Sequence, residues 1–471
     1  FTFTGRYDGS SKFADGNKWG FFPAGAVAYK ISQEKFIKDI KSISSAKLRL
    51  SYGLVGNQAI PEFGSLAQLN SDQFTFGNGN GEGLSTIFFT DQVANPNLTW
   101  ETTAQFDAGL DLALFKNRFE FTFDYFRKKT TDLLIANNRI PSQSGFSGFT
   151  ENFANITANG LEFSVNARII RNKTLAWTLN ANVSTGKAIV DGLPIDLLPS
   201  GFDQGWLPGG SQRLINGEEI GTFFGHKRAG IAQFDDFVEF QGLSNEEQIA
   251  LYNQDRTATY TFVDDYDGGI PRAGNRNRPG EQLYVDLDGN GELSEVDKEI
   301  IGQAQPDVTF GINNTFEIGN FDFSFFFDGQ FGNDVANVSN WNLLAFSQQQ
   351  QLAQVNQAWT PENPSTSNPR VDSTNNGAPN FVFSDRFIED GSFIRLQNVT
   401  LGYSLPADVL DDLKLTSLRF YISGTNLFTI TDYTGFNPDV NLTGRDNLSL
   451  GHDFGGYPLA RAIMMGLNIT L

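Results

Sequence analysis

The residues best suited to chemistry form one acidic loop, Asp286-Leu-Asp-Gly-Asn-Gly-Glu-Leu-Ser-Glu-Val-Asp297. Its spacing puts oxygen ligands at positions one, three and five, a glycine at six, a backbone carbonyl at seven and an acid at twelve, as in an EF-hand calcium loop. The predicted ligands are Asp286, Asp288, Asn290, Glu292 and Asp297. Aspartate at position twelve reaches less far than the usual glutamate, so we expect modest affinity. The loop predicts a structural calcium ion or another hard cation; the alternative is an Asx-rich turn before a strand.

Catalytic chemistry has little support in the sequence. Only two histidines occur, His226 and His452, and no nucleophile elbow, zinc-protease motif or phosphate-binding glycine loop surrounds them. The adjacent acids Glu389 and Asp390 would point to opposite faces of a strand, so they do not suggest a catalytic pair. The absence of cysteine excludes thiolate catalysis and cysteine-bound zinc. We therefore predict that the protein is not an enzyme and that each histidine is a lumen or loop residue.

Aromatic side chains in the long polar segments are the remaining candidates for ligand binding. Trp206, Trp341 and Trp359 could stack on sugar rings or on peptide side chains. The same rings could instead pack inside the loops and stabilise them. The sequence leaves both interpretations open.

The elements that must position these residues are β-strands. Apolar residues alternate with polar ones, for example from Phe119 to Tyr125 and from Phe321 to Phe327. A period of two predicts strands with one apolar face. The other face is uncharged or mildly acidic, which suits an all-β, transmembrane antiparallel β-barrel with an apolar band toward lipid and a water-filled interior.

Thirteen strands are predicted, at about 1–8, 18–32, 46–57, 98–115, 117–135, 158–171, 173–188, 220–234, 306–318, 320–334, 391–405, 415–430 and 458–471. Tight turns are predicted at 115–118, 170–173 and 318–321, where Asn or Gly can supply positive φ. Long connections span about 136–157, 189–219, 235–305, 335–390 and 431–457. A capping box at Ser244 and Glu247 predicts a short helix in the longest one.

The distribution of these connections favours a membrane barrel. Short turns at one rim and long loops at the other are typical of outer-membrane barrels. Bacterial single-chain barrels have even strand counts, so an odd count indicates either a miscount or, as we prefer, strands outside this sequence.

Composition agrees with one large β-domain. Phenylalanine accounts for 45 of 471 residues, yet the formal net charge is -20 and the mean hydropathy is -0.28. Alternation disperses the apolar residues, which keeps the mean hydropathy low. No run of about 18 apolar residues occurs, which excludes a helical membrane span. The low pI of about 4.5 argues against nucleic acid as a partner.

Several longer segments resemble the SusC/RagA-type TonB-dependent outer-membrane transporters. They include Arg6-Tyr-Asp-Gly-Ser-Ser-Lys-Phe13, Leu50-Ser-Tyr-Gly-Leu-Val-Gly-Asn57, Asn95-Pro-Asn-Leu-Thr-Trp-Glu101, Glu389-Asp-Gly-Ser-Phe-Ile-Arg395, Gly424-Thr-Asn-Leu-Phe428 and Tyr457-Pro-Leu-Ala-Arg461. The segments follow one another in the family's order and touch nearly all of the chain.

This resemblance implies that residues 1–471 are the C-terminal portion of a barrel of about 22 strands, with the family's plug domain and TonB box not in this sequence. It also implies an importer of oligosaccharides or peptides in the outer membrane of a Gram-negative bacterium, surrounded by outer-membrane lipid. The implied partners are a SusD/RagB-like surface lipoprotein and the TonB complex, and the implied assembly includes a dimer of transporter–lipoprotein pairs.

Two other functions stay open. A passive porin-like or structural barrel would have neither a plug nor an energised partner. A calcium-binding, β-rich glycan-binding module would use the acidic loop and the loop aromatics, and it would stay soluble without detergent because it would not expose rows of Phe and Leu.

Overall fold

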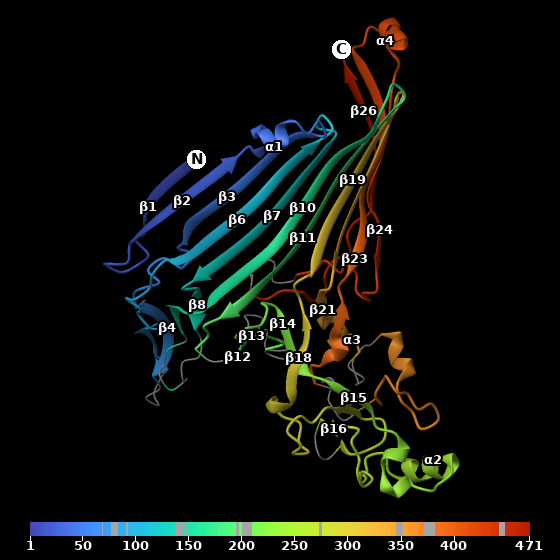
Figure 1. Cartoon of the computed structure of the whole chain (residues 1–471). Coiled ribbons are helices and arrows are strands. Elements are labelled where there is room, and N and C mark those ends of the chain that lie inside the picture. Colours follow the sequence, from blue (N-terminus) through green and yellow to red (C-terminus); the bar gives the residue numbers. More distant parts are fainter. Residues whose placement is uncertain are drawn as a thin grey trace.

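The computed structural model describes the chain except for residues 68, 77–82, 91–92, 138–142, 144–145, 147, 195–196, 200–209, 273–275, 345–351, 372–381 and 442–447. Two parts are visible in Figure 1. One is a large curved sheet, which we call the wall. The other, which we call the loop layer, is built from the long connections at one end of the wall.

The wall is a single antiparallel sheet of twelve strands. In spatial order they are β1 (Thr2–Gly9), β2 (Trp19–Tyr29), β3 (Ile43–Asn57), β6 (Glu101–Leu114), β7 (Phe119–Thr131), β10 (Asn155–Arg171), β11 (Leu175–Asp191), β19 (Val308–Ile318), β20 (Phe321–Phe331), β23 (Phe393–Ser404), β24 (Ser417–Thr431) and β26 (Ala462–Thr470). Spatial order follows chain order, and among the described residues β1 and β26 do not pair with each other. The predicted antiparallel sheet is confirmed, and in this chain the sheet is open.

Twelve of the thirteen predicted strands are wall strands. The prediction at 220–234 is wrong, because this segment forms β14 (Thr222–His226) and β15 (Arg228–Ile231) in two small sheets of the loop layer. A strand as short as β14 covers roughly 17 Å, whereas the apolar band of a barrel is ~25 Å tall. Most of β14 is also buried on both faces. The odd strand count was therefore a miscount.

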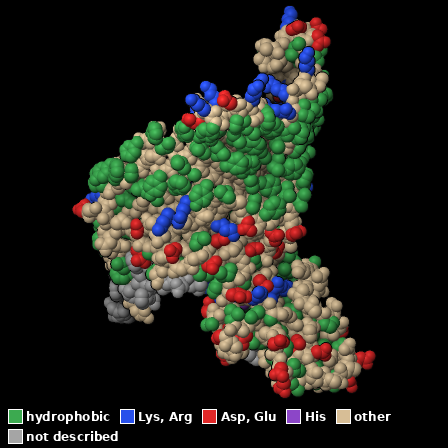
Figure 2. Space-filling model, in the orientation of Figure 1, with side chains coloured by type: hydrophobic (Ala, Val, Ile, Leu, Met, Phe, Trp, Pro, Cys, Tyr) green, Lys and Arg blue, Asp and Glu red, His purple; other side chains and the backbone are tan. Residues whose placement is uncertain are grey.

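The outward face of the wall is apolar across its width. Strand register aligns side chains into rows, such as Leu48, Leu110, Phe123, Phe163 and Val183 on five successive strands. Figure 2 shows the result as a broad green band across the sheet. Soluble proteins rarely expose so large an apolar surface, so this face is suited to lipid.

The predicted tight turns join β6 to β7, β10 to β11 and β19 to β20. Residues 115–117 all have positive φ at the first turn, and Gly319 has φ 59° at the third. The predicted positive φ is wrong at the second turn. There Asn172 makes an Asx turn instead, in which its Oδ1 accepts hydrogen bonds from the backbone N–H groups of Thr174 and Leu175.

The long connections leave the wall at the end opposite these turns (Figure 1). They cover 58–100, 132–154, 192–307, 332–392 and 432–461. The predicted long loops are confirmed, but two of them merge into 192–307 because no wall strand divides them. The connection at 58–100 was not predicted to be long; it contains the hairpin of β4 (Leu69–Phe76) and β5 (Gly83–Thr90).

Short strands and helices complete the structure. The strands are β8 (Leu134–Asn137), β9 (Phe149–Asn152), β12 (Leu197–Pro199), β13 (Gln212–Ile215), β16 (Ile270–Pro271), β17 (Gln282–Tyr284), β18 (Lys298–Gln303), β21 (Asp334–Asn337), β22 (Ile388–Asp390) and β25 (His452–Asp453). The helices are α1 (Lys35–Lys38), α2 (Asn245–Gln254), α3 (Val338–Leu343) and α4 (Ala407–Leu413). The predicted capping box is confirmed at the start of α2. None of the helices in the described part of the chain has the length and apolarity of a membrane span.

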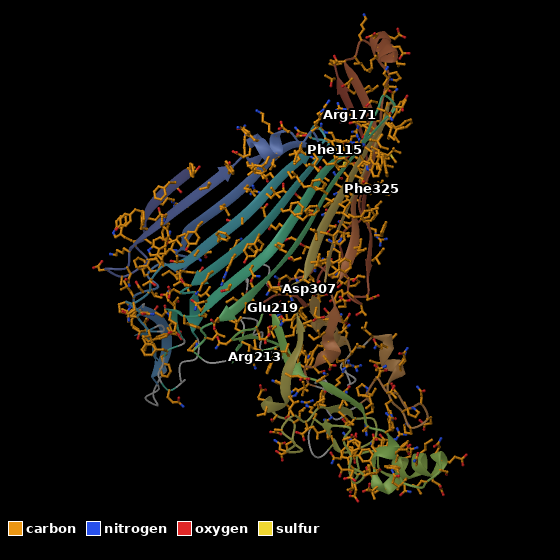
Figure 3. The ribbon with its side chains drawn as sticks, viewed as in Figure 1. Phe115, Arg171, Arg213, Glu219, Asp307 and Phe325 are labelled. Atoms are coloured by element: carbon orange, nitrogen blue, oxygen red, sulfur yellow. The ribbon has the colours of Figure 1, made fainter. Side chains whose placement is uncertain are left out.

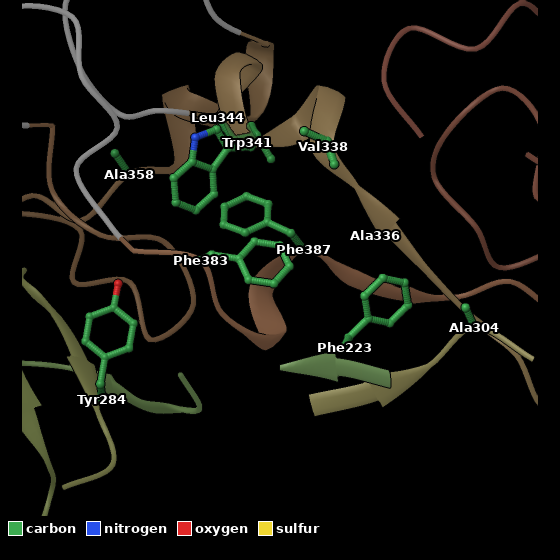
Figure 4. Close-up of a cluster of buried hydrophobic side chains, with 10 residues drawn as sticks. All are labelled: Phe223, Tyr284, Ala304, Ala336, Val338, Trp341, Leu344, Ala358, Phe383 and Phe387. Atoms are coloured by element: carbon green, nitrogen blue, oxygen red, sulfur yellow. The ribbon is translucent and has the colours of Figure 1, made fainter. Parts of the chain in front are cut away.

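The loop layer has hydrophobic cores of its own. The central one, drawn in Figure 4, consists of Phe223, Tyr284, Ala304, Ala336, Val338, Trp341, Leu344, Ala358, Phe383 and Phe387. These residues come from the connections 192–307 and 332–392, and Leu450 from 432–461 packs against them. The loop layer is therefore a packed unit assembled from three connections.

Candidate functional site

The inward face of the wall is polar and carries ion pairs that reach across three strands. Arg49 on β3 lies 2.9 Å from a carboxylate oxygen of Asp111 on β6 and 2.9 Å from one of Asp124 on β7. Gly109 lies between Arg49 and Asp124 in register. A Cβ at Gly109 would lie 2.2 Å from Asp124 Oδ1, so the missing side chain leaves the space in which the pair closes.

A second ion pair repeats this arrangement near the other edge of the wall. Arg419 on β24 donates to Asp322 on β20 through Nε at 2.9 Å and Nη2 at 2.5 Å. Gly402 on the strand between them leaves the space, since a Cβ there would lie 2.4 Å from Asp322 Oδ1. We call both arrangements glycine-bridged ion pairs. Each fixes charges of opposite sign on the inward face and connects a strand to its second neighbour.

A hollow on this polar face is the best candidate for contact with a solute. Its volume is about 490 Å³, and its polar lining includes Thr122, Glu162, Ser164, Asn182, Ser184 and Thr309. Hydroxyl and amide groups can both donate and accept hydrogen bonds, and a carboxylate accepts them. They suit ligands such as sugars and peptides, whose surfaces carry many donors and acceptors.

The wall is joined to the loop layer by charged contacts at its loop end. Lys187 Nζ lies 2.7 Å from Glu219 Oε1 and 2.8 Å from Asp307 Oδ1. In Figure 3, Glu219 and Asp307 lie at this end with Arg213 beyond them, whereas Phe115 and Arg171 mark the short-turn end. Lys187 thus links β11 to the residues just before β14 and just before β19.

The predicted calcium loop lies between β17 and β18, and the structure brings three of its ligands together. Carboxylate oxygens of Asp286, Asp288 and Asp297 lie within 4.8 Å of one another. Asp286 Oδ2 accepts a hydrogen bond from Gly291 N at 2.9 Å. Asn290 and Glu292 are exposed at the tip of the loop. Three of the five predicted ligands therefore lie close together, and cation binding by the loop stays a prediction.

Asp297 is the buried member of this group. Burial alone would raise the pKa of its carboxyl, but hydrogen bonds from the backbone N–H groups of Ser294 and Leu287 outweigh burial and hold the pKa below its usual range. Asp297 is therefore a carboxylate at neutral pH, the form that a hard cation binds.

The residues considered for catalysis have structural partners. His452 is fully buried, and its Nε2 lies 2.9 Å from Ser211 Oγ. Burial lowers the pKa of His452 to about 4, so the ring is neutral at physiological pH. Glu389 accepts hydrogen bonds from Thr434 N at 2.8 Å and from Asn337 Nδ2 at 2.9 Å. His226 also lies in the loop layer, so both histidines are loop residues, as predicted.

Two of the three tryptophans proposed for ligand contact, Trp341 and Trp359, lie in the described part of the chain. Trp206 lies outside the described residues. Trp341 belongs to the central loop core and packs against Phe387, with ring centroids 5.0 Å apart. Trp359 is 2% exposed and donates a hydrogen bond to Gln233. This placement favours the interpretation that Trp341 and Trp359 stabilise the loops, and their contact with a ligand stays a prediction.

Comparison with known proteins gives a consistent result. Residues 1–205 match the family described as TonB dependent receptor-like, beta-barrel. TonB-dependent receptor P3 of Formosa agariphila is 38% identical over 100% of this chain and 44% of its own length. TonB-dependent receptor SusC of Bacteroides thetaiotaomicron is 30% identical over 100% of the chain and 42% of its own length. The chain thus spans less than half the length of these curated relatives.

The fold agrees with the sequence comparison. The solved structure of the RagAB peptide transporter covers 100% of this chain with a TM-score of 0.75 and 22% identity, and the chain covers 45% of that structure. The similarity in sequence and the similarity in fold both extend over the whole chain. Over its whole length this chain matches the barrel portion of TonB-dependent receptors.

As part of a TonB-dependent receptor, the wall lies in the outer membrane. The proteins of this family are transporters rather than enzymes, which agrees with the predicted lack of catalysis. In such barrels the short turns face the periplasm and the longer loops face the cell exterior. The loop layer therefore lies on the cell surface, and the hollow on the polar face opens toward the interior of the receptor barrel.

Sequence reasoning did not single out the charged residues of the receptor wall. Arg49, Asp124, Arg419 and Asp322 all occupy polar positions of predicted strands. Which of them meet depends on register across two strand pairs, which alternation alone does not supply. A glycine such as Gly109 in the middle of a strand was the available signal, since strand glycines often mark a close approach of neighbouring groups.

Proposed function

We propose that the full-length protein imports oligosaccharides or peptides across the outer membrane with TonB-derived energy. The observation that carries this proposal is sequence similarity over the whole chain to TonB-dependent receptors, including SusC. The polar hollow supports it, because hydroxyl, amide and carboxylate groups bind sugars and peptide backbones alike. The likeness in fold to a peptide transporter is the reason to keep peptides beside oligosaccharides as substrates.

We further propose the parts and partners that such an importer needs. A plug domain, a TonB box and the remaining wall strands would come from the portion of the full-length protein that precedes this segment. Among the described residues no strand pairs with the outer edges of β1 and β26, which supports this, since a membrane barrel cannot leave backbone groups unpaired. A SusD/RagB-like lipoprotein would cover the loop layer, and two transporter–lipoprotein pairs would form a dimer. The likeness to RagAB supports the lipoprotein partner.

Energised uptake distinguishes this proposal from a passive barrel. Cells with and without the gene are supplied with fluorescent oligosaccharides and peptides, before and after a protonophore collapses the proton gradient. We expect uptake of one class that needs both the gene and the gradient. Uptake that needs the gene but persists without the gradient would favour the porin-like alternative and overturn the proposal.

We also propose that the acidic loop holds a structural calcium ion through Asp286, Asp288, Asn290, Asp297 and the backbone carbonyl of Glu292. The three clustered carboxylates and the EF-hand spacing support this assignment. Since Asp297 also accepts hydrogen bonds through both oxygens, it would be a weaker ligand than glutamate. We expect a Kd of about 10⁻⁴–10⁻³ M, as in extracellular modules.

Calcium at ten times its Kd should stabilise the loop layer by about 1.4 kcal/mol. The measurement is protease resistance of the purified full-length receptor with calcium and with a chelator. Asp286→Asn/Asp288→Asn should abolish the difference, whereas Asp264→Asn/Asp265→Asn, which changes two exposed acids of the same connection, should keep it. Equal resistance of the unmodified receptor in calcium and chelator would leave the Asx-rich turn as the correct interpretation.

A further inference from the structure

An apolar groove crosses the outward face of the wall from β3 to β11. Its volume is about 610 Å³, and its apolar lining includes Leu48, Leu50, Ala108, Tyr125, Leu161 and Val183. Two cross-strand rows form it. One is the row from Leu48 to Val183 described above, and the other consists of Leu50, Ala108, Tyr125 and Leu161 on four successive strands. The groove is present because the small Ala108 lies between the larger Leu50 and Tyr125. Its size is within the ~300–1,000 Å³ range of small-molecule sites.

Two basic side chains border this groove on the loop side. Side chains two residues apart on a strand share a face, so Arg127 and Lys129 follow Tyr125 on the outward face of β7. Both are exposed, and in the described part of the chain neither belongs to an ion pair. Lys187 on β11 lies in the same cross-strand row as Arg127, because Asn159 on β10 pairs with both residues. The charge of Lys187 is already neutralised by Glu219 and Asp307. Arg127 and Lys129 thus present two available positive charges.

The position of these charges relative to the membrane limits what can bind. Figure 2 shows basic side chains directly on the loop side of the green band, where the headgroups of the outer leaflet would lie. The Cα atoms of residues two apart on a strand are separated by about 7 Å, a spacing that lets one phosphate, or two on a sugar, reach both side chains. Arginine binds phosphate with two parallel hydrogen bonds, and lysine adds a compact charge.

We propose that this surface binds a phosphorylated, acylated glycolipid of the outer leaflet. Its acyl chain would lie in the groove over Ala108, and its phosphate would contact Arg127 and Lys129. The groove alone would accept any acyl chain, and the basic pair alone would accept any anion. Their adjacency at the boundary of the outer leaflet selects an amphiphile that carries both groups.

The test measures lipid that stays with the purified protein. The full-length receptor is extracted in mild detergent, and the bound phosphorylated glycolipid per barrel is quantified by mass spectrometry. Arg127→Gln/Lys129→Gln should lower it about tenfold, because charge-assisted hydrogen bonds to phosphate are lost. Ala108→Phe should lower it as well by filling the groove while leaving the charges in place. The matched control is Lys116→Gln/Lys128→Gln, which removes one charge at the short-turn rim and one on the inward face.

The outcomes distinguish a specific lipid-binding site from ordinary contact with boundary lipid. Selective loss in the first two variants, with lipid retained in the control, supports the proposal. Equal amounts in all variants, or a loss that is the same for phosphatidylglycerol and for the glycolipid, would mean unspecific boundary lipid and would overturn it. If the charge variant does not assemble, the Ala108→Phe result alone decides, since Ala108 is only half-buried and its side chain faces outward into the groove, where a larger apolar residue has room.

Discussion

Gly160→Val is expected to prevent most of the receptor from assembling in the outer membrane. Gly160 on β10 pairs with Gly186 and lies beneath the ring of Phe126. A Cβ there would lie 2.1 Å from the Thr185 carbonyl oxygen and 2.7 Å from that ring. The backbone atom cannot move without breaking strand pairing, so we expect a cost of about 3 kcal/mol or more. The measurement is the fraction of full-length receptor that migrates as a folded barrel on an unheated gel.

A glycine from the same wall provides the control for this substitution. A Cβ at Gly25 on β2 would come no closer than 3.9 Å to any other group, so Gly25→Val should assemble normally. The cost expected at Gly160 corresponds to roughly a hundredfold change in the folded-to-unfolded ratio. Normal folding of Gly160→Val would show that β10 and β11 do not approach as closely as the structure has them.

The second large effect is loss of loop-layer stability in acid, through His452. In the folded loop layer the pKa of His452 is about 4, against 6.5 for an ordinary histidine. Between these values the unfolded segment binds a proton that the folded segment does not, so stability falls as pH falls from 6.5 toward 4. The full loss is about 3 kcal/mol. Hydrogen exchange of β25 and the segments packed on it, measured between pH 7.5 and 4, should show progressive loss of protection.

Comparing the pH profiles of protection in the unmodified receptor and in His452→Gln isolates the contribution of His452 from that of other groups that titrate in the same range. The variant keeps a polar side chain near Ser211 but cannot take up the proton. At pH 7.5 the hydrogen-exchange protection of the variant should not exceed that of the unmodified receptor. Between pH 7.5 and 4 the protection of the variant should fall less steeply. Identical pH profiles for the two proteins would show that His452 is not buried as a neutral ring.

The wall could be predicted from the sequence, whereas the loop layer could not. Alternation from Phe321 to Phe327 specifies a strand and its apolar face, because lipid on one side and water on the other impose a period of two. β14 lacks that contrast, since most of it is buried on both faces, and it was mistaken for a wall strand. A local motif within the loop layer was also predictable, as the capping box of α2 shows.

The contacts between distant segments were outside the reach of sequence patterns. Trp341 and Trp359 looked alike as loop aromatics, yet the role of each depends on partners such as Phe387 and Gln233 that come from elsewhere in the chain. The glycine-bridged ion pairs have the same origin, because Arg419 and Asp322 lie on strands that are not adjacent. Pairing of this kind follows from register and tertiary packing rather than from local spacing.

The central loop core also restricts the order of folding. Its residues come from the connections 192–307 and 332–392, and Leu450 from 432–461 joins them. Contacts between segments so far apart in sequence form slowly, because loop closure must precede them. The core cannot be complete until the strands from β11 to β24 have brought all three connections to the same rim. Protection of Phe223 and Trp341 from solvent would therefore be a late event in assembly and a signal that this part of the wall has been built in register.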